Sequence, residues 1–296
     1  MVSHKSRYVR VAELALSLAE ETFPLYAHPK SPHRYTLPQR IACVLMMFYL
    51  NLSYRDMEEW LYATDQVCAA LGLQAVPDHT TLQRTYRRFR HSHIDALHHA
   101  LLGRLRPQEE VIAGDSTGFR FQSRSAYYQT RRGVPYREWL KGAYAVGTAS
   151  QLVLAQLAVR GPGIDAWLLP RLRRAARRYG RKEGGRRAWL FLLDAGFDGA
   201  PLEPGDLVPV VRRSGQRIAP ARQVRQELVS AARLDGVMGQ RWMSETVHSV
   251  IKRKFGDTIR SRQWRRQQRE PLMRGLAYNL HRVRPVSAVS FRVTAY

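Results

Sequence analysis

Two acidic residues each end an apolar run that is typical of a buried strand. "VIAGD" ends at Asp115, and "RAWLFLLD" ends at Asp194. If the strands at residues 111–115 and 188–194 lie side by side and parallel, their carboxyl ends meet at one edge of a sheet. The two carboxylates would then be neighbours. Carboxylate oxygens are hard ligands that suit Mg²⁺ or Mn²⁺.

A third acid, Glu245, stands in a strongly basic segment, "RWMSETVHSVIKRKFGD", at residues 241–257. At about 100° per residue, a helix here has one polar and one apolar face. The polar face holds Arg241, Glu245, His248, Ser249 and Lys252, and the apolar face holds Met243, Val247, Val250 and Ile251. Alone, the Arg241–Glu245 spacing is equally typical of a weak ion pair on a solvated helix.

The order of the three acids favours a shared site. If the apolar face of the helix packs on the sheet, Glu245 can join Asp115 and Asp194 as a third metal ligand. Two ions about 3.5–4 Å apart would activate a water or a 3′-hydroxyl and stabilise the leaving oxygen. The sequence therefore predicts a phosphoryl-transfer site with two Mg²⁺ or Mn²⁺ ions.

Asp198 and Asp165 are the rival carboxylates. Asp198 lies in an "FDG" turn, where a structural role is expected, whereas Asp194 directly ends its apolar run. Asp115 and Asp194 also have a structural reading, as turn residues before Ser116 and Ala195.

Net charge indicates the partner. The chain has 48 Lys and Arg against 24 Asp and Glu, a formal charge of +24. Such a charge is unfavourable through self-repulsion unless a polyanion relieves it, and nucleic acid is the obvious candidate. No membrane association is expected, because the longest apolar run, residues 41–50, is far shorter than the roughly 20 residues of a spanning helix. We expect a soluble, intracellular protein.

Residues 1–106 are predicted to form an all-α domain. Apolar spacing and caps indicate helices in "SRYVRVAELALSLAEETF", "LPQRIACVLMMFYLNL", "SYRDMEEWLYATDQVCAALGL" (capped by Ser53 and closed by Gly72) and "VPDHTTLQRTYRRF". Arg84, Arg87 and Arg88 on the last suggest a helix-turn-helix-like DNA-binding module, although a bundle with a basic surface has the same pattern. We read the histidines of "HSHIDALHH" (His91, His93, His98 and His99) as a solvated helix face.

Residues 107–284 are predicted to form an α/β domain, followed by a carboxy-terminal tail at 285–296. Elements are expected in the order β-β-β-α-β-β-α, with a turn near residues 149–151 and a strand in "DLVPVVRR". Two stretches, residues 171–187 and 252–274, each hold nine Lys or Arg. Solvated faces are the usual explanation for such runs, but the scarcity of acids favours phosphate contacts, with Arg253 and Lys254 among them.

The chain resembles the DDE transposases of bacterial insertion sequences. That family's last motif is Tyr, two residues, Arg, three residues, Glu, six residues, Lys, and Arg241, Glu245 and Lys252 match its spacing. "DSTGF" at 115–119 and "LLDAGFDG" at 192–199 resemble its first two acidic motifs, and "SYRDMEEWL" with "VPDHTTL" resembles its amino-terminal region. The resemblance covers roughly residues 35–285.

The resemblance implies an RNase H-like catalytic domain, with a mixed sheet flanked by helices, that cleaves and transfers DNA strands. Asp115, Asp194 and Glu245 would hold the metals, while Arg241 and Lys252 would grip DNA near the scissile phosphate. Double-stranded DNA, as terminal inverted repeats and target, would be the substrate. The family also implies a homodimer in the DNA complex. Free protomers at +24 repel, and no heptad seam is visible, so the dimer is expected to need DNA.

Two features set this sequence apart. Met238 stands where the motif has tyrosine, and only 50 residues separate Asp194 from Glu245, which leaves little room for the large β-rich insertion that some relatives carry. Two other functions remain open on the residues alone: an RNase H-like nuclease without transposition, and a DNA-binding protein that does not catalyse.

Overall fold

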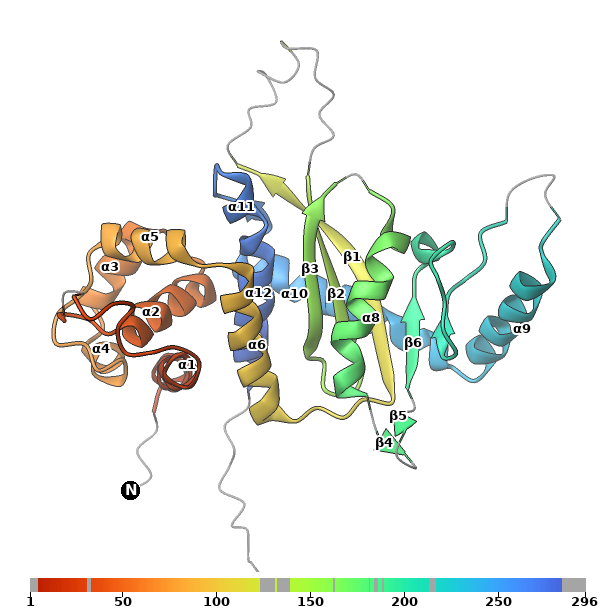
Figure 1. The fold of residues 1–296 in the computed structure, drawn as a ribbon, viewed down its shortest axis with the longest axis horizontal. Helices are drawn as coiled ribbons and strands as arrows, with labels where there is room; N and C mark the ends of the chain where they lie inside the picture. Colours follow the sequence, from red (N-terminus) through yellow and green to blue (C-terminus); the bar gives the residue numbers. More distant parts are fainter. Residues whose placement is uncertain are drawn as a thin grey trace, which may run out of the picture.

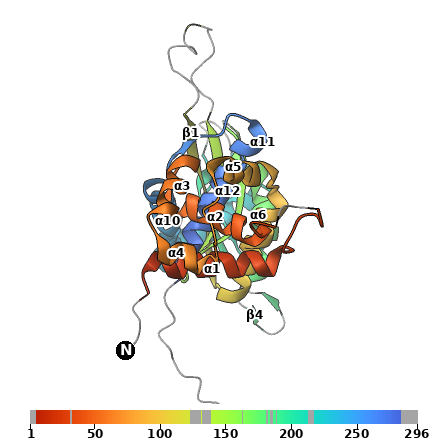
Figure 2. The ribbon, with the colours of Figure 1, turned by 90° about the vertical axis from the view of Figure 1, so that its left-hand side faces the viewer.

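The computed structural model describes residues 5–30, 33–122, 131, 139–161, 163–180, 182–183, 186–187, 189–212 and 217–283. The predicted tail at 285–296 lies outside these residues. In Figure 1 a group of amino-terminal helices lies on one side of a mixed sheet, and the long helices α6 and α12 stand between them. Figure 2, turned by 90°, places the amino-terminal helices in front of the sheet.

The amino-terminal helices follow the predicted caps. They are α1 (Arg7–Thr22), α2 (Leu37–Leu50), α3 (Tyr54–Tyr62), α4 (Asp65–Ala70), α5 (His79–Arg88) and α6 (His91–Leu105). Ser53 caps α3 and Asp78 caps α5 through side-chain bonds to backbone N–H groups. The single helix predicted from Ser53 to Gly72 is wrong, because the chain leaves the helix at Ala63 and Thr64 and restarts as α4.

The sheet has the order β3-β2-β1-β6-β7, and β8 pairs with the far end of β1. Its strands are β1 (Val111–Phe121), β2 (Leu140–Gly147), β3 (Val153–Arg160), β6 (Leu190–Leu193), β7 (Asp206–Leu207) and β8 (Thr258–Ile259). β1, β2 and β3 are antiparallel, whereas β6 and β8 lie parallel to β1, and β7 is parallel to β6. The predicted mixed α/β class is therefore confirmed.

Three details differ from the predicted strands. β1 does not stop at Asp115 but continues to Phe121, because β2 and then β8 pair with it beyond that residue. β7 is only two residues long, so most of "DLVPVVRR" is not strand. A small separate hairpin, β4 (Lys182–Glu183) with β5 (Arg186–Arg187), follows the basic helix α8 (Leu169–Ala176).

Helices cover both faces of the sheet, and side chains alternate between them. Along β2, Tyr144 and Val146 join the core on the side of α10 (Trp242–Phe255) and α12 (Arg269–Arg282), whereas Ala143 and Ala145 join the core beneath α8. All of β2 is buried, as expected for a strand covered on both faces. This alternation fixes which residues of β1 can reach α10.

Helix α12 was not predicted, although it is the most deeply buried helix of the described chain. Its core residues pack with those of α1 and α2 and with Tyr144 and Val153 of the sheet in one continuous cluster. Helix α9 (Pro220–Leu234) and the short α11 (Trp264–Gln267) were also missed. The predicted boundary at residue 106 does fall between the last amino-terminal helix and the first strand, but the apolar core continues across it.

His98 belongs to this core rather than to a solvated face. It is 3% exposed, and its Nε2 lies 2.8 Å from the Val153 carbonyl oxygen. Asn279 of α12 completes the contact: its Oδ1 accepts from the Val153 N–H at 2.9 Å, and its Nδ2 donates to the Val153 carbonyl at 2.8 Å. The prediction for His98 was wrong because the packing of β3 and α12 against α6 determines which side of this helix is buried, and the local sequence pattern does not show that packing.

Asn279→Ala should destabilise the protein by roughly 2–3 kcal/mol, because it leaves a buried N–H of β3 without its acceptor. Chemical unfolding followed by circular dichroism measures the change. Gln223→Ala, which removes an exposed amide on α9, is the matched control and should change the free energy of unfolding little. Equal losses in the two variants would show that the Asn279 bonds do not stabilise the sheet.

Candidate active site

The parallel pairing of β1 with β6 places the first two acids side by side. The register joins Ala113 to Leu192 and Gly114 to Leu193, so Asp115 and Asp194 are the next residues on adjacent strands. The predicted parallel arrangement is confirmed. Gly114 permits this approach, because a Cβ at that position would lie 2.6 Å from Leu193 Cδ2 and 2.7 Å from Phe191 Cε2.

Alternation along the strands directs both acids to the same face. Asp115 shares parity with Phe119, which packs in the core on the α10 and α12 side. Asp194 shares parity with Leu192, which packs with Met238 of the 3₁₀ segment η4 (Val237–Arg241) that leads into α10. Both carboxylates therefore face the segment that carries the third acid.

Arg241 connects the acids of β6 and α10. Its Nη2 donates to Glu245 Oε1 at 2.9 Å, and its Nη1 lies 3.9 Å from Asp194 Oδ1. The predicted Arg241–Glu245 pair is confirmed, and the contact with Asp194 shows that it is more than a local surface pair. The guanidinium places one positive charge between two carboxylates that would otherwise repel each other.

Asp115 is the most enclosed of the three acids. Its side chain is 19% exposed, against 53% for Asp194 and 58% for Glu245. Burial, reinforced by the negative charges of Asp194 and Glu245, raises the pKa of Asp115 to about 6. The Ser116 N–H, which donates to Asp115 Oδ1 at 2.7 Å, and the charge of Arg241 act in the opposite direction.

His248 lies beside Asp115, a placement that the sequence did not predict. We expected His248 on the polar face of the helix, but it is 6% exposed, and its Nδ1 lies 3.7 Å from Asp115 Oδ2. Burial, with the charge of Lys252, lowers the pKa of His248 to about 3, so the imidazole is neutral at physiological pH. The contact is therefore between a neutral ring and a carboxyl group and is not an ion pair.

The rival acids have structural partners. Asp198 is bound by Arg222 and Arg225 and accepts from the Val211 N–H at 2.8 Å, which supports ranking Asp194 above it. Asp165 accepts from Ser116 Oγ at 2.9 Å and from Lys141 Nζ at 2.7 Å.

The Asp165 contacts form a brace on the other face of β1. They tie β1, through Ser116, to β2, through Lys141, directly behind Asp115. Lys141 is only 9% exposed. A lysine within the otherwise apolar segment "LKGAYAVG" is the feature of the sequence that could have predicted a buried ion pair here.

The three acids fit a divalent cation by their chemistry. All three supply carboxylate oxygens, and the guanidinium of Arg241 shows that a cation is accommodated between Asp194 and Glu245. With the side chains where they stand, no three His, Cys, Asp or Glu residues of the described chain converge closely enough to hold a metal ion. Binding therefore requires the carboxylates to turn toward a common point and Arg241 to yield its place.

The predicted DNA-contacting residues lie on two separate elements. Arg84, Arg87 and Arg88 are exposed on α5. On α10, Lys252 is half-buried, with its Nζ 5.8 Å from the Phe119 ring centroid, whereas Arg253 and Lys254 are exposed.

Part of the predicted basic surface lies inside the protein. Arg173 is buried against Glu203 and Asp206, and Arg269 and Arg274 are buried in α12. These three arginines cannot contact a phosphate on the surface. Arg181 of the first basic stretch lies outside the described residues.

Comparison with known proteins identifies the family. A family model described as the transposase DDE domain matches residues 106–280. The chain belongs to this transposase family. No curated protein and no solved structure matches it. The sheet with its flanking helices is thus the RNase H-like DDE domain that the motifs predicted.

The DDE domain here is compact between its second and third acids. The described residues between Asp194 and Glu245 form β7, α9 and the 3₁₀ segments η3 (Ala195–Phe197) and η4. No β-rich insertion occurs among them, as the spacing predicted. Met238, at the position of the motif tyrosine, is 8% exposed and packs with Leu192, Leu207 and Val229, which fixes η4 on the sheet.

None of the helices in the described part of the transposase combines the length and apolar character that crossing a bilayer requires.

In the metal-free protein the Asp115 carboxyl group should titrate near pH 6, as its pKa predicts. Glu245→Gln should lower that pKa, because it removes one negative neighbour, and Arg241→Gln should raise it, because it removes the positive one. Carbon-13 NMR of the aspartate carboxyl groups measures both changes. A pKa unmoved by either substitution would show that the three groups do not share one electrostatic site.

Proposed function

We propose that this protein catalyses metal-dependent DNA strand cleavage and strand transfer at the ends of an insertion sequence. Family membership supplies the reaction class. The single observation that carries the proposal for this chain is that Asp115, Asp194 and Glu245, from β1, β6 and α10, lie on one face of the sheet, with Asp194 and Glu245 joined through Arg241. Mg²⁺ or Mn²⁺, as two ions, is the proposed cofactor.

Each residue has a role that follows from its position. Asp115, Asp194 and Glu245 would hold the metals, which supply charge stabilisation at the scissile phosphate and activate the attacking hydroxyl group. Arg241, once it leaves the carboxylates, offers a guanidinium suited to phosphate oxygens. Lys252 lies two helical turns beyond Glu245 and would contact the backbone of the same DNA strand.

The remaining basic residues would position the duplex. Arg253 and Lys254 extend the basic surface at the end of α10, and Arg84, Arg87 and Arg88 form a second exposed group on α5. Contacts of this kind hold DNA without reading its sequence, and they weaken steeply with salt. We propose residues 1–106 as the region that selects the terminal repeats, and residues 107–284 as the catalytic domain. A DNA substrate places the protein at the bacterial nucleoid.

Asp115→Asn, Asp194→Asn and Glu245→Gln should each abolish Mg²⁺-dependent cleavage of DNA that carries the element ends. Each change removes a ligand charge but keeps the side-chain shape, so binding of end DNA should remain, because carboxylates do not attract phosphates. Gel assays of cleavage and of binding, run on the same preparations, measure both effects.

Glu227→Gln is the matched control, because Glu227 is an exposed acid on α9. Normal cleavage by any of the three site variants would remove that residue from the proposed site. Cleavage by the wild-type protein without joining to target DNA would favour the nuclease alternative, and binding without cleavage would favour the non-catalytic one.

We further propose that the protein dimerises on DNA. Both ends of an element must be processed and joined to one target, which needs two active sites, and symmetric dimers are the commonest way to supply them. At a net charge of +24, free protomers repel, and DNA ends neutralise that charge.

Light scattering should therefore give the mass of a monomer or a weak dimer without DNA, and of a dimer with two end duplexes. A stable dimer of free protein at moderate salt would contradict the role of charge. One protomer bound to a pair of ends would contradict the dimer itself.

A further inference from the structure

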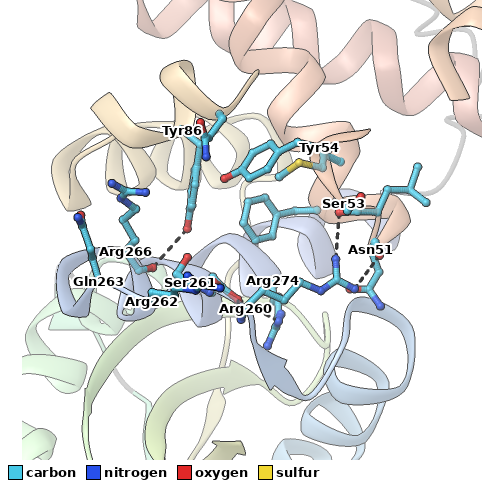
Figure 3. A pocket seen from close by; sticks show the side chains of 15 residues that line it. Asn51, Ser53, Tyr54, Tyr86, Arg260, Ser261, Arg262, Gln263, Arg266 and Arg274 are labelled. Atoms are coloured by element: carbon cyan, nitrogen blue, oxygen red, sulfur yellow. Dashed lines mark hydrogen bonds and ion pairs between the residues drawn. The ribbon is translucent and has the colours of Figure 1, made fainter. Parts of the chain in front are cut away.

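A pocket of about 480 Å³ lies between the amino-terminal helices and the carboxy-terminal segment (Figure 3). Residues of α2, α3 and α5 form one wall, and residues 260–274, on α11, α12 and the loop before them, form the other. Its volume falls within the range of small-ligand sites. The lining includes none of the three acids of the active site.

One wall of the pocket is aromatic. Phe48, Tyr54 and Tyr86 line it, and the rings of Phe48 and Tyr86 lie 5.2 Å apart at 54°. Figure 3 shows Tyr54 and Tyr86 above the arginines of the opposite wall. Burial, with the charge of Glu270, raises the pKa of Tyr54 to about 12, so its hydroxyl stays neutral. Such a surface suits a flat ring, because stacking on it requires no particular hydrogen-bond pattern.

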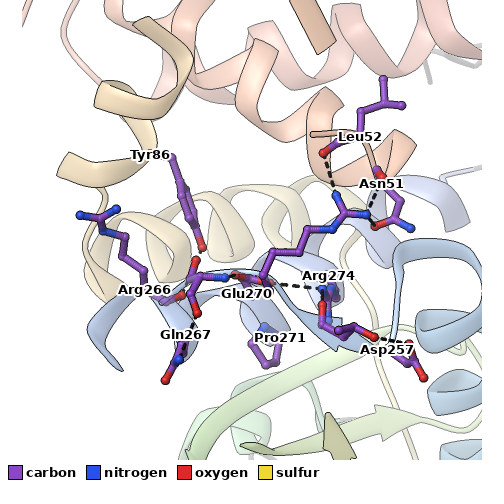
Figure 4. Close-up of polar contacts among 12 residues, drawn as sticks. Asn51, Leu52, Tyr86, Asp257, Arg266, Gln267, Glu270, Pro271 and Arg274 are labelled. Carbon is purple, nitrogen blue, oxygen red and sulfur yellow. Dashed lines mark hydrogen bonds and ion pairs between the residues drawn. The ribbon is translucent and has the colours of Figure 1, made fainter. Parts of the chain in front are cut away.

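The opposite wall is cationic. Four arginines and one acid line the pocket, a net charge of +3 (4 − 1): Arg260, Arg262, Arg266, Arg274 and Glu270. Arg260 donates to Asn51 and Leu52, and Figure 4 shows Glu270 beside Arg274, from which it accepts. In contrast, the guanidinium groups of Arg262 and Arg266 bond to no other residue of the described chain. These two groups are available to an anion.

Arg274 adds an unsatisfied cation beneath that wall. It is 2% exposed, and its Nη2 donates to the Thr258 carbonyl at 2.5 Å and to Glu270 Oε2 at 3.3 Å. Its Nε and Nη1 are buried and have no acceptor. Buried donors of a charged group are normally paired, since leaving them unpaired is unfavourable. A phosphate bound in the pocket would add negative charge near Arg274, whose only acidic partner among the described residues is Glu270.

We propose that this pocket binds a nucleoside phosphate, with the base against Tyr54 and Tyr86 and the phosphate against Arg262 and Arg266. Gln83 and Gln263, which also line the pocket, can donate to and accept from the base edge. The nucleotide has two possible sources, an unpaired nucleotide of DNA or a free mononucleotide. The DNA source rests on the proposed function, whereas the pocket chemistry is the same for both.

Phe119 of β1 lies between the pocket and the acids, because Arg274 and Lys252 both contact its ring. The Arg274 guanidinium carbon lies 5.4 Å from the Phe119 ring centroid, and the Lys252 nitrogen lies 5.8 Å from the same centroid. Phe119 is four residues beyond Asp115 on β1, about 13 Å at the usual rise of a strand. A nucleotide in the pocket would therefore be within a few nucleotides of the active site along one DNA strand.

Titration calorimetry of dAMP into the full-length protein, without divalent metal, tests the pocket directly. The wild-type protein should bind one dAMP, and Tyr54→Leu or the double variant Arg262→Ala/Arg266→Ala should weaken binding by roughly tenfold or more. Arg265→Ala is the matched control, because Arg265 is exposed on the same short helix but does not line the pocket. It should bind dAMP as the wild-type protein does.

Competition then identifies the source. A duplex with one bulged adenosine that displaces dAMP better than a fully paired duplex supports the DNA source, and no such advantage supports the free mononucleotide. Three results would contradict nucleotide binding in this pocket. They are no saturable binding at millimolar dAMP, equal losses of dAMP affinity in Arg265→Ala and the double variant, or competition by inorganic phosphate as strong as that by unlabelled dAMP. These binding measurements do not depend on Asp115, Asp194 or Glu245. A negative result would therefore rule out the pocket without ruling out the proposed catalysis.

Discussion

The parallel pairing of β1 with β6 is the constraint on which the candidate active site depends. Asp115 and Asp194 belong to segments 79 positions apart in the sequence (194 − 115), and only this register makes them neighbours. Gly114 leaves room for this pairing, because a Cβ there would lie within 3 Å of the Leu193 and Phe191 side chains. A one-residue slip would turn one of the two carboxylates to the opposite face, beneath α8.

Charge balance follows from that pairing. Two acids on adjacent strands and a third on α10 concentrate negative charge in a protein whose net charge is +24. Arg241 contacts two of them, and the pKa of Asp115 is raised mainly by burial and further by the negative charges of Asp194 and Glu245. The acids stay close because β1, β6 and α10 are held by buried apolar contacts. A metal ion would take over this charge compensation only after the carboxylates turn toward a common point and Arg241 moves away.

The sequence predicted the relative placement of Asp115, Asp194 and Glu245 better than the packing around them. The parallel pairing of the two apolar runs and the Arg241–Glu245 pair depend on local pattern, and both occur in the fold, although β1 continues past Asp115 to Phe121. His98 was interpreted as part of a solvated face and His248 as part of the polar face of its helix, and both are buried. Which side of an amphipathic helix is covered depends on elements remote in sequence. Helix α12 was missed because its first residues were interpreted only as part of the basic stretch at 252–274.

The basic character of the carboxy-terminal segment concealed its burial. Arg269 donates to the carbonyls of Tyr86 and Phe89, and Arg274 is enclosed beside Glu270. Composition alone assigns such residues to the surface, where arginine is normally found. Besides Glu270, which lies on α12 itself, their partners lie in or directly after α5 and in β8, which no local pattern connects to α12. Tertiary pairing therefore removed some of the predicted phosphate contacts and, at the same junction, created the aromatic and cationic pocket.

Binding of Mn²⁺, followed by electron paramagnetic resonance, tests most directly whether the three acids form one metal site. The account predicts saturable Mn²⁺ binding to the wild-type protein and a loss of about tenfold or more in affinity for each of Asp115→Asn, Asp194→Asn and Glu245→Gln. Glu227→Gln should bind as the wild-type protein does. Wild-type affinity in any one of the three site variants would contradict a shared site.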